Sequence, residues 1–514
     1  MLGKLWPVLI GVAVVMATLV ALRPLLPIDE TRYLSVAWEM WLSGDPVHLT
    51  KNGEMYTHKT PLLFVVINLV WLVTGVSEFA ARLVGPVCAV GMVAGTAMLA
   101  RRLWPAQDLG IRSALILCGF PVFLIYGSAT MFDALLALGV LGGVAALWSI
   151  GQGRGGWIGF GLALAFGVYA KGPVILVHLM PILLTMPYWA PNPPRLAQIA
   201  KGFGGSLLIA LALIALWLVP TLLTATPEFR TELLWTQSAA RVAGGMAHDR
   251  PFWFLAALLP LLLFPWGWSI RLWRGFSGTW SDPAIKLCTI WAASTLILFS
   301  LISGKQAHYL LPAYPAMALL FAYASVRAKS GSLASVALLL LAAGAGAIGL
   351  GFIPATGDLA LLAPYWSLTA LAALCVVLAV LIWRLPRIPG HLLAGTGLAL
   401  GIHGIIATTG LYAAYDGQSL ANTLAPHEAD GLAVSNAEYN AEINFLGRLT
   451  SPVALTPDLA SLTAWAQAHP NGVFFGRVKE NPLTARPQQV FRYMGDDWGL
   501  WPASAISRGS APSD

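Results

Sequence analysis

The chain has 514 residues, of which 57% are hydrophobic and only 10% are charged, and its formal net charge is +7. A mean hydropathy of +0.72 excludes a soluble globular domain and is typical of a protein that crosses a membrane many times. The positive charge fits cationic cytoplasmic loops and anionic lipid. No basic run is interleaved with aromatic residues, which argues against nucleic acid as a partner.

The predicted membrane segments start at the N-terminus, where a short basic start precedes a long apolar run without a clear small-residue cleavage site. This pattern predicts an uncleaved first helix rather than a signal peptide. Helices of about 20 residues cross a hydrocarbon core of about 30 Å, and about thirteen such spans fit the chain. We expect them near residues 5–26, 81–100, 111–128, 132–150, 155–170, 172–189, 203–222, 253–270, 285–302, 309–326, 331–353, 362–383 and 391–413. The four cysteines all lie in apolar runs and imply no disulfide framework.

The segment after the first span, residues 30–42, has apolar residues at helical spacing and two tryptophans. This pattern predicts an amphipathic helix in the membrane interface with tryptophan anchors. Asp29 and Glu30 stand at its start, where acidic residues favour the helix N-terminus, so a pure capping role is one interpretation of the pair. A role in chemistry is the other. Spacing does not decide which of the two neighbours would face a substrate, because they point about 100° apart.

The apolar segment 61–77 poses a choice, because counting it as a span would move every later loop to the other side of the membrane. Lys and Arg residues are enriched in cytoplasmic loops. With 61–77 left in the interface, nearly all basic residues of the later short loops fall on the side of Lys4. We therefore predict a cytoplasmic N-terminus and an exoplasmic C-terminus, with a first exoplasmic loop over 27–80 that carries helices lying along the membrane.

This threading gathers the unusual polar residues on the exoplasmic face. They are Asp29-Glu30, His58-Lys59, Asp133, Lys171 in a Gly-Pro hairpin, His248 and the 303–312 tip. Pairing with lipid headgroups explains single basic residues, whereas an anionic substrate explains the group. A transporter would place ionisable residues within its helices, near the bilayer midplane. Residues at helix mouths favour a reaction at the membrane surface.

The last hundred residues have a different composition. Ten of the 23 acidic residues follow residue 413, and the long apolar runs stop there. We expect a transmembrane domain over 1–413 and a small water-facing α/β domain over 414–514. Its pattern predicts, in order, a strand near 430–436, a helix over 438–449, a strand near 452–456, a helix over 457–470 and strands near 472–478 and 489–494.

Seven short motifs occur in one order along the chain: "IDETRYL" (28–34), "THKTPLL" (57–63), "GVSEFAARL" (75–83), "SATMFDAL" (128–135), "AKGP" (170–173), "PFWF" (251–254) and "SGKQAHYLLP" (303–312). The ordered set resembles the GT-C glycosyltransferases that use a lipid-phosphate-linked sugar. The group includes the bacterial lipid A aminoarabinose transferases and, more distantly, the protein O-mannosyltransferases (families 39 and 83). The resemblance implies a polytopic helical GT-C fold with juxtamembrane helices in the first exoplasmic loop.

The resemblance also implies site residues. It assigns catalytic roles to Asp29, Lys59 and Asp133. For Asp133, a plain helix cap stays as the alternative. Substrate-binding residues are expected at Glu30, Arg32, Tyr33, Lys171, Arg241, Lys305, His308 and Tyr309.

Two departures from the family pattern concern a metal site. The family has a Glu-Lys-Pro-Pro motif. In this chain His58 stands where the motif has its glutamate, and Thr60 stands where it has its first proline. In some members that glutamate and a histidine of the fourth exoplasmic loop bind a metal, and His248 occupies the equivalent place. His58 and His248 are therefore candidate ligands of Zn²⁺ or another divalent metal, with surface or substrate-contacting histidines as the alternative.

The implied function is transfer of a sugar from a polyprenyl (undecaprenyl) phosphate donor to an envelope acceptor, such as lipid A, at the periplasmic face of a bacterial inner membrane. Cations near the developing phosphate charge would stabilise the leaving group. Asp29 is the expected base for a hydroxyl acceptor. No nucleotide site is expected, because no Gly-rich phosphate loop follows a strand. The alternatives are a protein O-glycosyltransferase, a lipid-linked glycan transporter without catalysis, and a scaffold or sensor that acts through the C-terminal domain.

Overall fold

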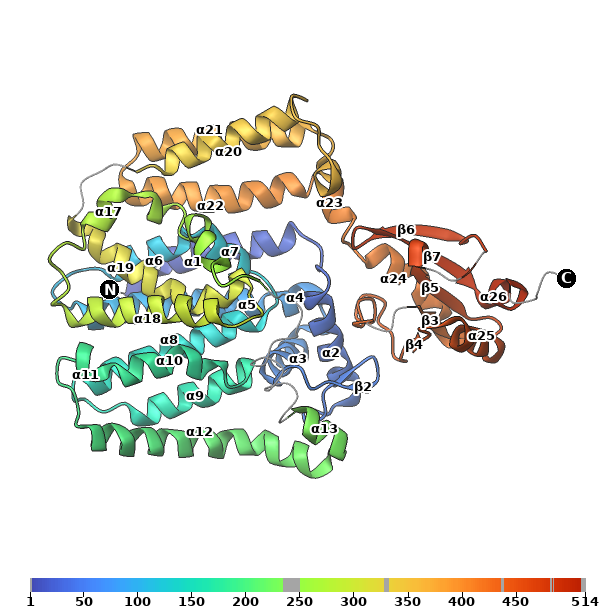
Figure 1. Cartoon of the computed structure of the whole chain (residues 1–514), viewed down its shortest axis with the longest axis horizontal. Coiled ribbons are helices and arrows are strands. Elements are labelled where there is room, and N and C mark those ends of the chain that lie inside the picture. The colour runs from blue at the N-terminus through green and yellow to red at the C-terminus, as the bar shows by residue number, and fades with distance from the viewer. Residues whose placement is uncertain are drawn as a thin grey trace.

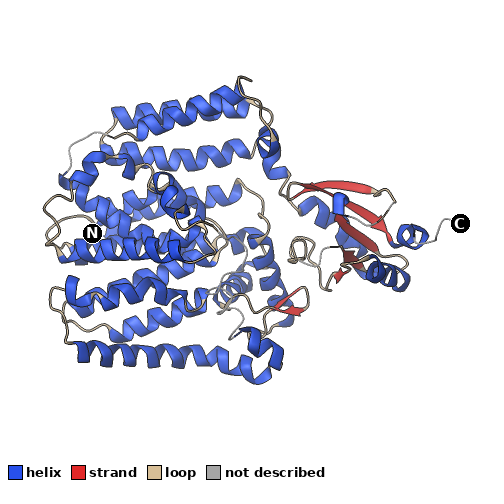
Figure 2. Cartoon of the chain, in the orientation of Figure 1, coloured by secondary structure: helices blue, strands red, loops and turns tan. Residues whose placement is uncertain are grey.

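The computed structural model describes residues 2–233, 250–327, 332–435, 439–480, 483 and 485–509. Figure 1 shows a bundle of helices that run side by side, with the N-terminus toward one end and a small sheet beyond the other. Figure 2 shows that helices dominate and that strands occur in the C-terminal sheet and in one short hairpin. The end of the bundle that carries the sheet is called the α2 end below.

Eight helical segments among the described residues are long and apolar enough to cross a membrane, or nine if the bent pair α6 and α7 counts as one span. These segments are formed by α1 (Leu2–Ala21), α4 (Glu78–Arg82) with α5 (Val84–Leu103), α6 (Gly110–Cys118) with α7 (Pro121–Gly127), α8 (Phe132–Gly151), α12 (Leu196–Thr224), α18 (Pro283–Leu301), η3 (Ala307–Ala313) with α19 (Tyr314–Arg327), α21 (Trp366–Arg384) and α22 (Arg387–Ile406).

Three other expected spans are present as shorter apolar helices, namely α9 (Trp157–Lys171), α10 (Val174–Leu184) and α20 (Ala334–Gly349). The prediction for 253–270 was wrong in form. That stretch folds as the short helices α15 (Phe254–Ala257), α16 (Leu259–Leu262) and η2 (Trp266–Trp268), followed by α17 (Ile270–Arg274). Pro260 and Pro265 interrupt it, because proline donates no backbone hydrogen bond and its ring clashes with the preceding turn. Shorter elements are α11 (Met186–Trp189), α13 (Pro227–Thr231), η4 (Gly357–Leu362) and α23 (Gly410–Ala413).

The first loop folds onto the α2 end of the bundle. It contains α2 (Asp29–Ser43), the hairpin of β1 (Thr50–Lys51) and β2 (Glu54–Met55), and α3 (Leu62–Thr74). The segment left out of the spans, α3, lies against α2, where Asn68 Nδ2 donates to the carbonyl of Ala37 at 2.8 Å. The helix α2 is less exposed than an interfacial helix would be. Its polar Ser35 is fully buried, whereas Leu42 on its expected apolar face is 44% exposed.

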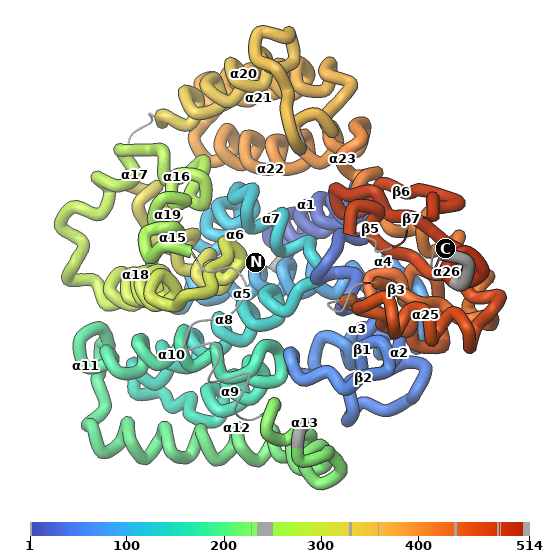
Figure 3. The backbone as a smooth tube through the Cα atoms, turned by 45° about the vertical axis from the view of Figure 1, so that its right-hand side comes forward, coloured from blue at the N-terminus to red at the C-terminus, as the bar shows by residue number. Residues whose placement is uncertain are grey.

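The C-terminal region forms a five-stranded sheet in the order β4-β3-β5-β7-β6. The parallel strands β3 (Leu432–Val434), β4 (Ala454–Leu455) and β5 (Val473–Arg477) are joined by antiparallel β7 (Asp496–Pro502) and β6 (Gln489–Tyr493). The helical elements are α24 (Gln418–Leu424), η5 (Ala425–Asp430), α25 (Leu459–Ala468), η6 (Val478–Glu480) and α26 (Ala503–Gly509). Figures 1 and 3 both place this sheet at the α2 end.

One prediction for the C-terminal region was wrong. In place of the expected helix over 438–449, residues 442–448 form a series of turns. Ala441 and Arg448 have φ values of 59° and 53°, which a right-handed helix does not allow. Buried apolar side chains of the bundle form one contiguous cluster with those of this segment and of the sheet, including Tyr439, Phe445 and Trp498. The sheet is therefore packed onto the first loop.

Candidate active site

Asp133 lies at the centre of a polar cluster at the α2 end. It is the second residue of α8, is only 2% exposed, and accepts a hydrogen bond from Lys171 Nζ at 2.6 Å. His308 Nε2 lies 3.8 Å from its other carboxylate oxygen. Lys171 is the last residue of α9 and His308 belongs to η3, so three elements bring these side chains together. The carboxylate is held by two basic side chains, which a plain helix cap does not require.

Aromatic rings close the sides of this cluster. Lys171 Nζ stands 4.4 Å from the centroid of the Tyr309 ring, a cation–π contact, and Tyr126 faces the His308 imidazole at 5.5 Å. Such rings hold a cation or a sugar face without neutralising the charge. Tyr126, which the sequence reasoning missed, belongs to α7, in the segment just before Asp133.

Asp29 stands at the start of α2 and forms an ion pair with Arg32 one turn later. The Asp29 side chain is 43% exposed and the Arg32 side chain 17%, so the carboxylate is accessible. Arg32 also lies 5.2 Å from the ring of Tyr33, which packs edge-on against Phe132 of α8. Burial, together with the Asp29 charge, raises the pKa of Tyr33 well above its usual value, so that the phenol stays protonated and neutral.

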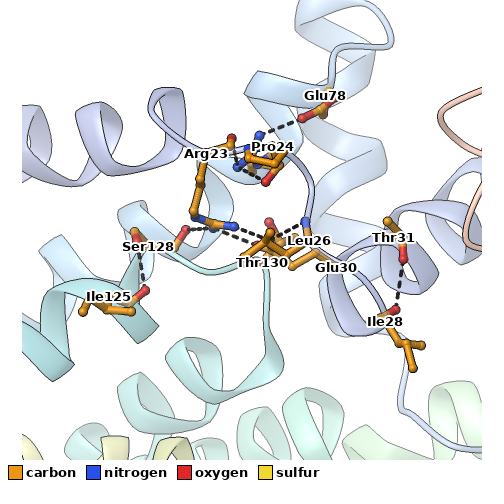
Figure 4. Close-up of polar contacts among 11 residues, drawn as sticks. Arg23, Pro24, Leu26, Ile28, Glu30, Thr31, Glu78, Ile125, Ser128 and Thr130 are labelled. Carbon is orange, nitrogen blue, oxygen red and sulfur yellow. Dashed lines mark hydrogen bonds and ion pairs between the residues drawn. The ribbon is translucent and has the colours of Figure 1, made fainter. Parts of the chain in front are cut away.

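Glu30 has the opposite environment to its neighbour. It is only 4% exposed and forms a two-pronged ion pair with Arg23, whose Nη2 donates to Glu30 Oε1 at 2.8 Å. Its oxygens also accept the backbone N–H groups of Thr130 at 2.7 Å and Leu26 at 3.2 Å. Figure 4 shows Glu30 enclosed by Arg23, Leu26 and Thr130. Burial alone would raise the Glu30 pKa, but Arg23 outweighs it and holds the pKa at about 2.

The pair of acids therefore divides into two roles. Asp29 keeps an accessible carboxylate, whereas Glu30 joins the end of α1 to the segment that leads into α8. Arg82 extends the same network, donating to the carbonyl of Arg23 at 2.8 Å and to Glu78 at 2.7 Å. The N-cap residue of α2 is Ile28, whose side chain makes no capping hydrogen bond, and the two acids occupy the first turn. The substrate-binding role predicted for Glu30 thus receives no support from its position.

Lys59 and His58 come from the segment before α3. The charges of Lys59 and Asp29 both act on the His308 imidazole, and Lys59 also acts on Asp133, so these groups share one electrostatic neighbourhood. The His58 pKa is lowered by burial and by the nearby cations Lys59 and Arg32, which keeps its imidazole neutral at pH 7. His58 Nε2 lies 3.9 Å from Glu232 Oε1, which accepts a hydrogen bond from Thr57 Oγ1 at 2.7 Å.

The remaining expected site residues lie elsewhere or beyond the described ranges. Lys305 is 3% exposed, and its Nζ donates to the carbonyls of Arg250 at 2.7 Å and Ser303 at 3.3 Å. These bonds tie the 303–312 segment to the start of the 250–254 segment. Arg241 and His248 fall outside the described residues.

A metal site is only partly represented. The described residues contain no group of three or more His, Cys, Asp or Glu side chains that could hold a metal ion. His58 and Glu232 are nonetheless suitable donors for Zn²⁺, because one is a neutral imidazole and the other a carboxylate beside it. Glu232 was not expected from the sequence, where it is a single acid far along the chain from His58.

The arrangement brings three cationic side chains and two carboxylates to one end of a helical bundle. Lys59, Lys171 and Arg32 can bind the oxygens of a phosphate, and an accessible carboxylate such as Asp29 can accept a proton. The combination suits a group transfer in which a phosphate leaves and a hydroxyl or phosphate oxygen attacks. An apolar groove of about 500 Å³ is lined by residues of α16–α19 and by Leu310 of η3, the element that also carries His308.

Comparison with known protein families gives one match, over residues 58–222, to the dolichyl-phosphate-mannose-protein mannosyltransferase family. Similar curated proteins are the undecaprenyl phosphate-alpha-4-amino-4-deoxy-L-arabinose arabinosyl transferases. The protein from Pseudomonas paraeruginosa is 30% identical over 58% of this chain and 55% of its own length. The one from Erwinia tasmaniensis is 29% identical over 68% of this chain and 63% of its own length. The chain thus matches little more than half the length of several such relatives.

Solved structures extend the likeness to the whole chain. ArnT from Cupriavidus metallidurans bound to undecaprenyl phosphate matches with a TM-score of 0.77 and 19% identity, covering 99% of both chains. The apo oligosaccharyltransferase of Archaeoglobus fulgidus matches with a TM-score of 0.52 and 14% identity over 93% of this chain and 70% of that one. The fold is therefore that of a GT-C membrane protein with many spans, and the predicted resemblance is confirmed.

Proposed function

We propose that this chain is a membrane glycosyltransferase that moves a sugar from a polyprenyl phosphate to an acceptor at the α2 end of the bundle. The observation that carries the proposal is the buried Asp133, held between Lys171 and His308 and sharing its electrostatic neighbourhood with Lys59 and Asp29. The similarity to the aminoarabinose transferases and the match to ArnT support the same reaction class.

In the proposed reaction, the bond between the glycosyl carbon and the phosphate oxygen breaks as the acceptor oxygen forms a new bond to that carbon. The phosphate leaves with both bonding electrons, and nearby cations stabilise this developing charge. Lys59 and Arg32 are the first candidates for that role. Lys171 is already hydrogen-bonded to Asp133 at 2.6 Å, so it contributes charge while its position is fixed.

Asp29 is the proposed base when the acceptor is a hydroxyl. Its carboxylate is 43% exposed, and Arg32 on the next turn holds it in place. A phosphate acceptor is ionised already, and Asp29 would then orient it rather than deprotonate it. Asp133 is too enclosed to exchange protons freely. Its proposed role is to fix Lys171 and His308 at the reacting centre.

The membrane orientation is part of the proposal. The distribution of basic residues favours a cytoplasmic N-terminus, and it puts the α2 end and the C-terminal domain (414–514) on the periplasmic side of a bacterial inner membrane. Polyprenyl-phosphate sugars are the donors suited to that face, because they need no nucleotide pool. A divalent metal at His58, with Glu232 and His248 as further ligands, would help to anchor the first loop near the site.

A lipid A-type glycolipid is the first acceptor candidate, because the likeness to ArnT covers the whole chain. A protein acceptor is the alternative, favoured by the name of the family matched over 58–222. A non-catalytic glycan transporter is less favoured, since the cluster of charges lies at one end of the bundle rather than along it.

The test supplies the purified protein with labelled undecaprenyl-phosphate sugars and with lipid A or peptide acceptors, and follows label in the product by mass. Asp29→Asn and Lys59→Ala are expected to lower transfer by at least about 10²-fold, the scale seen when an acid–base group or a group that stabilises developing charge is removed. Glu54→Gln and Lys201→Ala, both at exposed positions, are the matched controls and should transfer normally. Normal transfer by both site variants would refute the proposal.

A further inference from the structure

The 439–453 segment, which precedes β4, packs against α2 at Ser35 and Trp38. Ser35 Oγ donates to the carbonyl of Ala441 at 2.7 Å and accepts the N–H of Phe445 at 3.1 Å. Trp38 Nε1 donates to the carbonyl of Leu449 at 2.7 Å. In a helix these backbone groups would bond to one another. Here side chains of α2 bond to them, so the turns are stabilised by α2.

A second group of contacts fixes the same segment to the β1–β2 hairpin. Asn52 Nδ2 donates to the Val453 carbonyl at 2.8 Å, and its Oδ1 accepts the Val453 N–H at 2.8 Å and Asn444 Nδ2 at 3.1 Å. The ring of Phe445 stacks on Trp71 of α3, with centroids 5.5 Å apart. The C-terminal region is thus anchored on α2, on the β1–β2 hairpin and on α3.

The anchored segment meets the cations of the site at Asn440 and at its neighbour Tyr439, whose carbonyl accepts from Lys51 Nζ at 3.3 Å. Asn440 Oδ1 lies 3.4 Å from Arg32 Nη1 and 3.4 Å from Lys51 Nζ. The Asn440 N–H donates to Glu442 Oε2 at 2.9 Å, and the next residue, Ala441, has a left-handed φ of 59°. A sharp turn with two fixed neighbours therefore aims this amide at both cations.

Two like charges, those of Arg32 and Lys51, meet at this amide. Burial lowers the pKa of Lys51, and the like charge of Arg32 lowers it further. Asp29 pairs with Arg32, and the carboxylates of Glu442 and Glu39 act on Lys51 as opposite charges. Glu39 accepts the N–H groups of Asn52 at 2.5 Å and Gly53 at 3.1 Å, and Glu442 is buried. A neutral amide oxygen can hold two cations together without cancelling their charge, as a carboxylate at the same place would.

We propose that Asn440 is a positioning residue, through which the C-terminal region holds Arg32 and Lys51 as a cationic pair that binds a phosphate group of a substrate. This inference rests on the proposed transferase function and deepens it. It gives the C-terminal sheet a part in substrate binding and adds Lys51 to the residues that contact substrate. The phosphate belongs to the polyprenyl donor or to a phosphorylated acceptor, since both carry the same chemistry.

The test replaces the amide by its isosteric acid in the full chain. Asn440→Asp puts a carboxylate between the two cations and should weaken binding of the phosphate by about tenfold or more, whereas Asn440→Ala should weaken it by only a few-fold. Both should melt within about 2 °C of the wild type, because the 3.4 Å contacts are long and partly exposed. Glu54→Gln, at an exposed position of β2, is the control and should leave both the melting temperature and the substrate KM unchanged.

Two titrations identify the source of the phosphate. The KM for an undecaprenyl-phosphate sugar is measured at fixed lipid A, and the KM for lipid A at fixed donor. A rise in the donor KM with Asn440→Asp assigns the pair to the donor, and a rise in the acceptor KM assigns it to the acceptor. If neither KM rises, or if Asn440→Asp loses stability and activity in parallel, the inference is overturned.

A separate binding measurement distinguishes this inference from the proposed function. Undecaprenyl phosphate alone is titrated against the wild type, Asn440→Asp and Lys59→Ala. Weaker binding by Asn440→Asp in a protein that transfers no sugar would support the cationic pair and refute the transferase proposal. Unchanged affinity and unchanged KM values in Asn440→Asp, with transfer lost in Lys59→Ala, would support the transferase proposal and refute the cationic pair.

Discussion

Asp29 and Glu30 show how two adjacent identical charges acquire different roles from their surroundings. The Asp29 carboxylate is 43% exposed, while Glu30 is enclosed by Arg23 and two backbone N–H groups. Removing one partner from a buried ion pair leaves an uncompensated charge, which typically costs about 3–5 kcal/mol. The Asp29 carboxylate is itself partly solvated, so removing it from its pair with Arg32 costs less. Stability and activity should therefore separate between the two positions.

Glu30→Gln is expected to lower the free energy of unfolding by about 3 kcal/mol or more at pH 7, since it leaves Arg23 buried and unpaired. The difference should depend on pH in a defined direction. The pKa of Glu30 is lowered from 4.5 to about 2, so its stabilising charge is fully present above pH 4.5 and is lost as pH falls toward 2. Thermal melts of both proteins should converge over that interval. Asp29→Asn should melt like the wild type at pH 7, and a large loss of stability there would contradict this division.

The Asp133–Lys171 pair permits a test of geometry against charge. Either Asp133→Asn or Lys171→Met alone breaks a buried pair and should destabilise the protein by about 3–5 kcal/mol. The double variant removes both charges and should recover much of that stability, because no unpaired charge stays buried. Transfer should stay low in all three variants if the pair positions His308 and the cations. Melting temperature and transfer rate are measured together, and recovery of transfer in the double variant would show that the pair serves stability alone.

At the scale of elements, the site depends on how closely α5 approaches the turn before α8. A Cβ on Gly85 would lie 2.4 Å from the carbonyl oxygen of Ala129, a backbone atom that cannot yield alone. The neighbouring Thr130 N–H binds Glu30 at 2.7 Å, and Asp133 follows three residues later. A side chain at Gly85 must therefore displace residues 129–130, which bind Glu30 and lead into Asp133.

Gly85→Ala is expected to reduce both stability and transfer, even though alanine favours a helix by about 1 kcal/mol over glycine. Gly91→Ala, on the same helix, is the matched control. Its Cβ would meet only the flexible side chain of Leu138, at 3.3 Å, so the change should be neutral or slightly stabilising. Melting and transfer of the two variants provide the measurement. Equal behaviour of both would mean that the turn before α8 adapts without disturbing the site.

Some elements were predictable from the sequence because their causes are local. Long apolar runs predicted most of the spans, and the Gly-Pro pair after Lys171 predicted the hairpin that brings Lys171 toward Asp133. The broken helices between 253 and 270 were not predicted, because hydropathy averages over prolines that interrupt hydrogen bonding. The turns after Asn440 were missed for another reason. The helical spacing of their apolar residues is overridden by contacts with Ser35 and Trp38, which lie 400 residues earlier.

The site residues also divide into those that the sequence identifies and those that depend on contacts distant in the chain. The resemblance identified Asp29, Lys59 and Asp133, and the structure brings all three into one electrostatic neighbourhood. Spacing gave no means of separating Asp29 from Glu30, because that difference depends on Arg23 and Thr130. Glu232 is distant in the chain from His58, and only the fold brings them within 3.9 Å.

At the scale of the whole molecule, one end of the bundle carries the first loop and the sheet, and α12 runs from the opposite end to it. Its 29 residues span about 43 Å at 1.5 Å per residue. Thr224 at its last turn contacts His48 of the first loop, with Thr224 Oγ1 2.6 Å from His48 Nε2. Lys201, near its start, therefore lies far from the α2 end. Opposite ends of such a helix should meet opposite sides of a membrane.

Single cysteines at exposed positions test this orientation. Glu54→Cys in β2 and Asp497→Cys in β7 lie at the α2 end, and Lys201→Cys lies near the other end of the bundle. A membrane-impermeant thiol reagent added to intact cells should label the first two and leave the third unlabelled until the membrane is opened, because positively charged loops stay in the cytoplasm. The parent chain is the background control, since Cys118, Cys288 and Cys375 are buried and Cys88 is half-buried. Labelling of Lys201→Cys alone in intact cells would reverse the orientation and place the proposed site in the cytoplasm, where nucleotide-linked donors would have to be considered.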